Sequence, residues 1–299
     1  MLPIAKIEVS HDEAIAIGSP PSRLKTYASF VKLEHTVFSL PLIVAGTLLH
    51  TYGWPRPSLL AWIFLAAIGG RVMAMGLNRI IDAELDARNP RTSRRELPQG
   101  AMQVQEAWVI VGIAGAIYLG SAAAIAPICF WLAPIPVALF VIYPYLKRYT
   151  ALAHLGLGLT WSMAPLGGWL AASKSLRPIG EIGWLWLFSV LWVTGFDIIY
   201  ATMDEAFDRK AGLYSLPVTL GKRPALQAAA VVHALAFLAL AALWRTQLYS
   251  PIAWWWLLAV GVVLIWQHAV AERKPEFAFF QLNSLIGFFV LGLVLAGIR

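Results

Sequence analysis

The sequence predicts an all-α protein that crosses a membrane many times. Of its 299 residues, 59% are hydrophobic and 13% are charged, whereas a soluble domain carries roughly 25% charged residues. Apolar runs of about 20 residues, the length of a helix that spans a bilayer, follow one another with short polar loops between them. Since no long hydrophilic block separates these runs, we expect a single transmembrane domain at 23–299 after a short soluble tail at 1–22.

Nine of the apolar segments are long enough to be expected as spanning helices. The third and fourth are nearly continuous, and we divide them at Pro127 because proline disfavours a helix interior but suits a first helical position. The expected helices cover 30–52, 58–81, 105–126, 128–146, 151–172, 180–201, 224–244, 251–270 and 277–297.

The distribution of basic residues predicts the orientation of these helices. With the N-terminus in the cytoplasm, most Lys and Arg residues fall in loops on the cytoplasmic side of the cell membrane, and the C-terminus lies on the opposite side. The same loops account for the net charge of +7, so nucleic-acid binding is not expected. Cys129, the single cysteine, lies in an apolar run, which excludes an intrachain disulfide and a thiolate metal cluster.

An acidic motif closes the second expected helix, in the segment NRIIDAELD. Asn78, Asp82 and Asp86 follow one another at four-residue intervals, so a continuous helix would carry them on one face. Like charges at this spacing destabilise a helix, and a lone carboxylate in the bilayer costs on the order of 3 kcal/mol. The motif therefore needs compensating positive charge.

A second acidic motif, DIIYATMDEAFD, closes the sixth expected helix. Asp197, Asp204 and Asp208, with Tyr200 between them, also fall on one helical face. Each motif lies on the cytoplasmic side and is followed by Leu-Pro and then Gly, which suggests a duplicated half. The pair predicts a Mg²⁺ site, because Mg²⁺ takes oxygen ligands from carboxylates and substrate phosphates. Zinc is not expected, since neither motif contains Cys or His; ordinary solvated helix ends are the alternative.

A Mg²⁺ site of this kind predicts an anionic substrate, and basic residues accompany both motifs. Lys147 and Arg148 lie side by side in the loop YPYLKRYT and are expected to bind phosphate. Arg79 directly follows Asn78. Arg71 lies about two turns deeper in the same expected helix, where an Arg is a functional candidate. We expect it either to neutralise the carboxylates or to bind an anionic group of a second substrate.

Together these motifs resemble those of the UbiA superfamily of intramembrane prenyltransferases. The flanking segments NRIIDAELDARNPRT and KLEHTVFSLP are most similar to its 4-hydroxybenzoate polyprenyltransferase branch, and the resemblance covers 23 to about 297. It implies about nine transmembrane helices bundled around a central cavity with a cytoplasmic polar cap. It also implies Mg²⁺-dependent transfer of a prenyl group from a polyprenyl diphosphate to an aromatic acceptor, with release of diphosphate and a hydrophobic tunnel for the prenyl chain.

The pattern and the resemblance together assign expected roles. The metal ligands would be Asn78, Asp82, Asp86, Asp204 and Asp208, of which Asn78 and Asp82 would touch the ion directly. The catalytic residues would be Asp82, Asp86, Asp197, Asp204 and Asp208, and the substrates would be bound by Arg71, Arg79, Tyr143, Lys147, Arg148 and Tyr200. Asp86 would act through water or a basic partner. Asp197 would support the metal site, although orienting the acceptor or accepting its proton stays open. His35 and His154 are expected to be interface or core residues.

Other interpretations stay open. Within the family, the acceptor could be a naphthoate, a haem, a chlorophyllide or a glycerol phosphate lipid, but a small anionic ring suits an Arg-containing pocket best. A cation-coupled transporter also carries intramembrane carboxylates on repeats, yet its site would lie at the midplane and not at one face. A non-catalytic lipid-binding scaffold gives no reason for so many charges near the membrane. The expected partners are the two substrates and the lipid bilayer, with no obligate protein partner.

Overall fold

The computed structural model describes residues 22–32 and 36–298, and this part of the chain forms helices and contains no strand. In chain order the helices are α1 (Arg23–Val31), α2 (Thr36–Thr51), α3 (Pro57–Ile81), α4 (Ala83–Arg88), α5 (Val104–Ile125), α6 (Pro127–Leu132), α7 (Pro134–Leu146), α8 (Ala153–Ser173), α9 (Gly180–Ala201), α10 (Glu205–Ala211), α11 (Leu216–Leu220), α12 (Lys222–Gln247), α13 (Pro251–Ala271) and α14 (Pro275–Gly297). The all-α prediction is confirmed. His35 and nearly all of the expected N-terminal tail lie outside the described residues.

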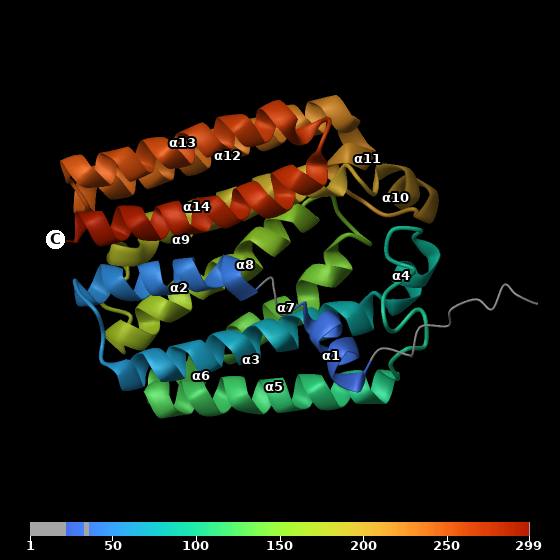
Figure 1. Ribbon diagram of the computed structural model, residues 1–299, viewed down its shortest axis with the longest axis horizontal. Coiled ribbons are helices and arrows are strands. Elements are labelled where there is room, and N and C mark those ends of the chain that lie inside the picture. The colour runs from blue at the N-terminus through green and yellow to red at the C-terminus, as the bar shows by residue number, and fades with distance from the viewer. Residues whose placement is uncertain (1–21, 33–35, 299) are drawn as a thin grey trace, which may run out of the picture.

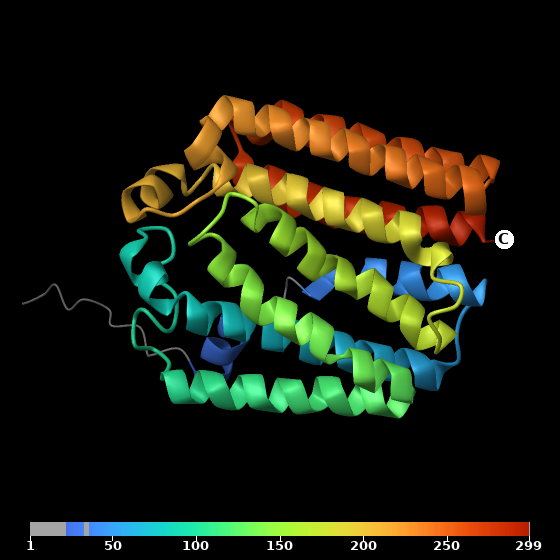
Figure 2. The same cartoon turned by 180° about the vertical axis from the view of Figure 1, so that it is seen from behind.

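The long helices lie side by side as a bundle, and the short helices α4, α10 and α11 gather at one end of it (Figures 1 and 2). The C-terminus lies at the opposite end. The largest core cluster includes the fully buried Phe188 and Trp192 of α9 and Trp169 of α8, packed with side chains of α2 and α12–α14. Large apolar side chains such as Trp255 and Ile265 are exposed, as expected on a surface that faces lipid.

Seven helical segments are long and apolar enough to cross a membrane, which makes the chain a multi-pass membrane protein. They are α3, α5, the combined α6 and α7, α9, α12, α13 and α14. The expected count of nine is therefore not confirmed. The apolar part of α2, Ser39–Thr51, is shorter than a span. Helix α8 has the expected length, but glycines and polar residues, with His154, Thr160 and Ser162 buried among them, lower its hydropathy.

Glycines bring α8 close to the helices that flank it. A Cβ atom on Gly168 would lie 2.2 Å from the carbonyl oxygen of Ile43 in α2, and one on Gly158 would lie 2.5 Å from that of Val190 in α9. Only glycine permits such backbone contact, which is a common way to pack helices in a membrane. The contacts fix α8 between α2 and α9, so the polar face of α8 is held against the second acidic motif.

Each acidic motif crosses a break between two helices, which corrects the expectation of continuous helical stripes. Helix α3 ends at Ile81 and α4 begins at Ala83, with Asp82 at φ −96° and ψ 4°. The break lies between the turns that carry Asn78 and Asp86, which a continuous helix would stack on one face.

The second motif repeats this local geometry. Asp204 precedes α10 with φ −104° and ψ 1°, in the same sparsely populated region where many active-site residues lie. The backbone N–H of Asp208 donates to the carbonyl of Asp204 at 2.8 Å, as that of Asp86 does to Asp82 at 2.8 Å. In each motif a long helix is followed by a bend at an Asp, Asp82 or Asp204, and by a short helix that carries a further Asp, Asp86 or Asp208. This shared geometry supports the suggested duplication.

Candidate active site

A cavity of about 610 Å³ is lined by both acidic motifs and by the loop that joins α7 to α8. The expected site residues that line it are Arg71, Asn78, Arg79, Asp82, Asp86, Tyr143, Lys147, Asp197, Tyr200, Asp204 and Asp208. Arg148 is the expected site residue that does not line it. Segments far apart in the sequence thus meet around one polar space, as the paired motifs predict.

Asp82 is buried and faces two cations. Lys147 Nζ donates to Asp82 Oδ2 at 2.6 Å, and Arg148 Nη2 donates to Oδ1 at 3.4 Å. Asn78 Nδ2 also reaches Oδ2, at 3.3 Å. Arg148 Nη2 donates more closely to the carbonyl of Ile81, at 2.8 Å, which is the last residue of α3. Arg148 therefore holds the helix end behind Asp82, and its expected contact with phosphate stays a prediction.

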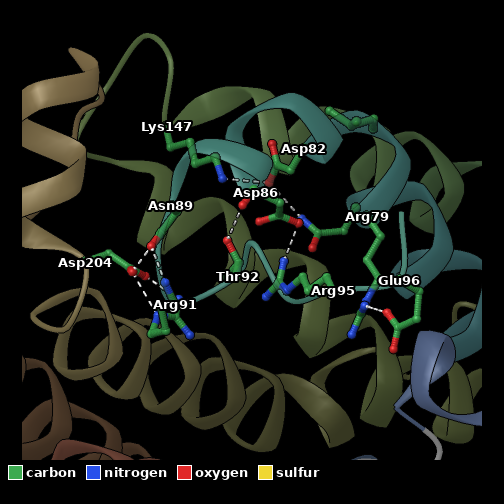
Figure 3. A network of polar contacts seen from close by, with 12 residues as sticks. Arg79, Asp82, Asp86, Asn89, Arg91, Thr92, Arg95, Glu96, Lys147 and Asp204 are labelled. Carbon is green, nitrogen blue, oxygen red and sulfur yellow. Dashed lines mark hydrogen bonds and ion pairs between the residues drawn. The ribbon is translucent and has the colours of Figure 1, made fainter. Parts of the chain in front are cut away.

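Asp86 has a basic partner, which was one of its two expected kinds of contact. Arg95 Nη1 lies 2.6 Å from Asp86 Oδ2, and the Thr92 hydroxyl donates to the backbone carbonyl of Asp86 at 3.2 Å (Figure 3). Arg79 forms an ion pair with Glu96, and its side chain is only 4% exposed. Its charge is thus matched by a carboxylate of the chain, and its expected contact with substrate stays a prediction.

Asp204 receives its positive partner from the loop that follows the first motif. Asn89 Nδ2 and Arg91 Nε donate to Asp204 Oδ1 at 2.9 and 2.8 Å, and Arg91 Nη2 pairs with Oδ2 (Figure 3). Arg91 also donates to the Tyr200 hydroxyl and lies 4.7 Å from the centre of that ring. Desolvation alone would lower the pKa of Arg91, but these contacts with Asp204 and Tyr200 raise it. The loop after α4 therefore ties the two motifs together.

Asp208 has a different environment. Among the described residues, its carboxylate has no hydrogen bond and no ion pair within 4 Å. Burial, and then repulsion from the neighbouring Asp204, raise the pKa of Asp208 to about 6. Its negative charge would be stabilised by a cation bound between the motifs.

Asp197 lies deeper in α9 and contacts a histidine. His154 Nδ1 is 2.7 Å from Asp197 Oδ2, and His154 Nε2 accepts the backbone N–H of Leu216 at 3.2 Å. His154 is buried, as expected, but it also lines the cavity. The pairing of Asp197 with His154 was not expected from the sequence, and the expected support of the metal site by Asp197 stays a prediction.

A second cavity, of about 270 Å³, has mainly aliphatic, alanine and glycine walls from α2, α3 and α5–α8. Arg71, Tyr143, Leu157 and Trp161 line both cavities, so the polar and apolar spaces meet at these side chains. The guanidinium of Arg71 lies 5.2 Å from the centre of the Trp161 ring. Its buried Nε has no hydrogen-bond partner among the described residues. The junction thus offers a hydrogen-bond donor to a ligand.

Sequence reasoning missed several residues that organise the site. Asn89, Arg91, Arg95 and Glu96 provide most of the contacts that close the loop between α4 and α5. The arginines were visible only as part of a basic loop, which the positive-inside rule already explains. Arg91 reaches Asp204 across a separation of 113 residues, and no local pattern indicates such a pairing.

Comparison with known proteins identifies the family. A model of the UbiA prenyltransferase family matches residues 39–295. The chain belongs to this family. As a UbiA-family member it is a transferase, and the combination of paired acidic motifs with an apolar cavity is the arrangement that the sequence resemblance implied.

Two solved structures agree with this UbiA-family chain in fold, and one relative is similar to it in sequence. The apo structure of a UbiA homologue from Aeropyrum pernix K1 has a TM-score of 0.81 and 35% identity, and covers 86% of this chain and 95% of its own. A UbiA homologue from Archaeoglobus fulgidus bound to GPP and Mg²⁺ has a TM-score of 0.69 at 18% identity, over 91% and 99%. A 4-hydroxybenzoate solanesyltransferase of a Synechocystis strain is 29% identical over 255 residues, which are 83% of this chain and 86% of the relative.

Proposed function

We propose that this chain transfers a prenyl group from a polyprenyl diphosphate to an aromatic acceptor and releases diphosphate, with Mg²⁺ required and 4-hydroxybenzoate as the favoured acceptor. The observation that carries the proposal is the meeting of a polar and an apolar cavity at Arg71, Tyr143, Leu157 and Trp161. A prenyl diphosphate has the same division, because its charged head suits the polar cavity and its hydrocarbon tail suits the apolar one.

The donor atoms of the polar cavity support Mg²⁺ as the resident ion. Within the described ranges, no three His, Cys, Asp or Glu side chains converge as a preformed metal-binding group. This suits Mg²⁺, which keeps several waters and takes further ligands from substrate phosphates. The residues that would hold it are Asn78, Asp82, Asp86, Asp204 and Asp208. When bound, the ion would neutralise the diphosphate as it leaves.

Lys147 is the basic residue best placed to bind the diphosphate. It lines the polar cavity, its side chain is 34% exposed, and its ammonium already points to Asp82. A flexible lysine stem lets this ammonium move from the carboxylate to a phosphate oxygen, where it stabilises charge that develops as the allylic C–O bond breaks. Arg148 would keep Asp82 and the end of α3 in place during this exchange.

Arg71 supports an acceptor that carries a carboxylate. Arg71 lines both cavities, its buried Nε has no hydrogen-bond partner among the described residues, and a carboxylate would satisfy it. The Synechocystis relative is named for 4-hydroxybenzoate, which has a carboxylate opposite a phenol. The carbon ortho to that hydroxyl would attack the allylic cation, while the aromatic faces of Trp161 and Tyr200 would stabilise positive charge and the closed junction would exclude water.

The proposed orientation places the polar cavity toward the cytoplasm, as the concentration of basic residues in its loops supports. The proposed transferase domain covers 23–299, and the proposed partners are the two substrates and the bilayer, without an obligate protein partner or nucleic acid. In this orientation, water-soluble acceptor and Mg²⁺ reach the polar cavity from the cytoplasm, and the prenyl chain lies within the membrane.

The test is a reconstituted reaction. Purified protein would be incubated with Mg²⁺, labelled geranyl diphosphate or longer donors and a panel of acceptors that contains 4-hydroxybenzoate, a naphthoate and a glycerol phosphate lipid. We expect a prenylated 4-hydroxybenzoate by mass spectrometry, diphosphate release and loss of both with EDTA. Product from another panel member only would reassign the acceptor. Ion movement in sealed vesicles without prenyl substrate, together with no product, would instead favour a transporter.

A further inference from the structure

We propose that Asn283 donates a hydrogen bond to the oxygen on the acceptor ring, and that Trp192 and Gln267 are positioning residues that fix the direction of its side-chain amide. The inference rests on the proposed function. An aromatic acceptor that is anchored only by its carboxylate can swing about that end. Attack by the carbon next to the hydroxyl therefore benefits from a second contact, at the opposite end of the ring.

Asn283 belongs to a buried polar network within the helix bundle. Trp192 Nε1 donates to Asn283 Oδ1 at 3.0 Å, and Gln267 Nε2 donates to the same oxygen at 3.1 Å. The three side chains come from α9, α13 and α14, and each residue is at most 2% exposed. Polar side chains are costly in a membrane-spanning bundle, and those that persist there are commonly functional.

The partners of Asn283 determine which way its amide points. An indole N–H can only donate, so the amide oxygen of Asn283 must face Trp192. The amide nitrogen then faces the other way, and Nδ2 donates one of its two hydrogens to the carbonyl of Phe279 at 2.8 Å. The second hydrogen has no acceptor among the described residues, and Asn283 lines the polar cavity. A ligand oxygen in this cavity can accept it.

Asn283 lies at nearly the same depth as Arg71, on a different wall of the polar cavity. Asn283 lies eight residues after Pro275, where α14 begins, and Arg71 lies ten residues before Ile81, where α3 ends. At 1.5 Å per residue, the two lie about 12 and 15 Å from these helix ends. Both ends lie at the end of the bundle that carries the short helices (Figure 1). The two residues can therefore contact opposite ends of one small ligand.

Aromatic rings connect the two residues along the cavity. The guanidinium of Arg71 lies 5.2 Å from the centre of the Trp161 ring, which is 6.1 Å from that of Phe196. Phe196 in turn lies 5.3 Å from Trp192, the residue that holds Asn283. All of these side chains line the polar cavity. An aromatic acceptor suits this surface, because rings pack favourably edge-to-face and offset-stacked.

The proposed contact has a defined chemical preference. The N–H of Asn283 needs a ligand atom with an available lone pair, which a phenol oxygen provides. An aromatic amine at the same position is a poor acceptor, because its lone pair is delocalised into the ring and its own hydrogens face the amide. A site built to hydrogen-bond a substrate group rejects an analogue that leaves its buried donor unpaired. We therefore expect 4-hydroxybenzoate to be favoured over 4-aminobenzoate.

The first test uses the unaltered chain and a matched pair of ligands. The compounds 4-methoxybenzoate and 4-ethylbenzoate have nearly the same shape, but only the first has an oxygen on the ring. Both would be measured as competitors of 4-hydroxybenzoate. We expect the methoxy compound to compete about 3- to 10-fold more strongly, which is the size of one hydrogen bond. Equal competition by the two compounds would overturn the proposal.

The second test replaces the donor with an acceptor of the same shape. In Asn283→Asp, Oδ1 can still accept from Trp192 and Gln267, whereas the nitrogen becomes an oxygen. We expect the ratio of kcat/KM for 4-hydroxybenzoate to that for 4-aminobenzoate to fall by about 10-fold, with the KM of the prenyl donor unchanged. Gln267 lines neither cavity. Gln267→Leu should lower the same ratio by about 2- to 4-fold, because Trp192 still holds the amide.

Ser284→Ala is the matched control. Ser284 follows Asn283 in α14, and its hydroxyl donates to the carbonyl of Phe280 at 3.0 Å, but it lines neither cavity. Its acceptor ratio should not change. Equal losses for both acceptors in Asn283→Asp, with the ratio unchanged, would make Asn283 structural and overturn the proposal. If the unaltered chain forms no product from either acceptor, the proposed function is overturned and this assignment with it.

Discussion

The two acidic motifs share a backbone design but differ in how their charges are compensated. In each, a long helix ends, an Asp lies at the bend with nearly the same φ and ψ, and a short helix carries the second Asp. Asp82 and Asp86 of the first motif face Lys147, Arg148 and Arg95. In the second, Arg91 compensates Asp204, and Asp208 has no cation within 4 Å among the described residues.

This difference indicates how a duplicated element can become a single site. The cation of the second motif comes from the loop that follows the first, so the two halves are joined by an ion pair and not only by packing. Both carboxylates of the first motif are compensated by basic side chains, whereas the second motif keeps an uncompensated carboxylate. We therefore expect a divalent ion to be attracted first by the second motif. The first motif would complete the coordination of this ion once diphosphate is present.

The largest effect is expected from removing the Asp at the bend of either motif, Asp82 or Asp204. Asp82→Ala and Asp204→Ala should each lower kcat/KM for the prenyl donor by about 10³-fold, because each removes charge that would hold the metal and diphosphate. Diphosphate release at saturating Mg²⁺ measures this. Glu205→Gln, which removes a half-buried carboxylate whose ion-pair partner among the described residues is Arg209, is the matched control. A tenfold smaller loss in one motif would mean that the motifs are not equivalent halves of the site.

A smaller effect is expected from the adjacent basic residues, and it separates their roles. Lys147→Ala should raise KM for the donor and lower kcat/KM by about 10²-fold, because it removes a charged contact to the diphosphate. Arg148→Ala should chiefly lower the thermal unfolding temperature, because it leaves the Ile81 carbonyl without its side-chain donor. Donor kinetics and unfolding temperature would be measured on both variants. Equal kinetic losses at equal stability would contradict this division.

A still smaller effect tests whether Arg91 competes with metal. In the ligand-free chain Arg91 occupies Asp204, so an incoming ion has to displace it. Arg91→Ala should tighten Mn²⁺ binding in the absence of donor by about 2- to 5-fold, the size expected for a partly exposed ion pair. Titration followed by the Mn²⁺ paramagnetic resonance signal measures this. Arg94→Ala is the control, because Arg94 also lines the cavity but forms no ion pair within the described ranges. Weaker Mn²⁺ binding in Arg91→Ala would contradict the competition.

The sequence was sufficient to predict the membrane class, the proline-marked break before α6 and the convergence of both acidic motifs. These follow from hydropathy, from the stereochemistry of Pro127 and from the cost of unpaired carboxylates near a bilayer. The bends at Asp82 and Asp204 were not predictable from spacing, because four-residue intervals suit a continuous helix equally well. Spacing also could not distinguish Lys147, which lines the cavity, from Arg148, which does not.

Contacts between polar side chains far apart in the chain could not be predicted from the sequence, for a related reason. His154 was expected to be a core or interface residue, and the side chain is indeed buried. Its partner was not predicted. Its contact with Asp197 depends on how glycines set α8 against α9. Hydrophobic periodicity specifies which face of a helix is buried, but it carries no information on which polar side chain of a neighbouring helix that face meets.

The smallest effect is expected from removing Asp208, the uncompensated carboxylate of the second motif, and it is measured as a change in thermal stability. The folded pKa of Asp208, about 6, lies above its ordinary value of 3.8. Folding therefore disfavours its charged form, and this penalty is absent when both states are protonated, grows as pH rises from about 4 to 6, and is complete above pH 6. In EDTA, Asp208→Asn should raise the unfolding temperature at pH 8 by about 2 to 4 °C and change little at pH 4. Asp86→Asn, which removes a carboxylate paired with Arg95, should lower it at pH 8. A fall in both variants would show that the two motifs are compensated alike.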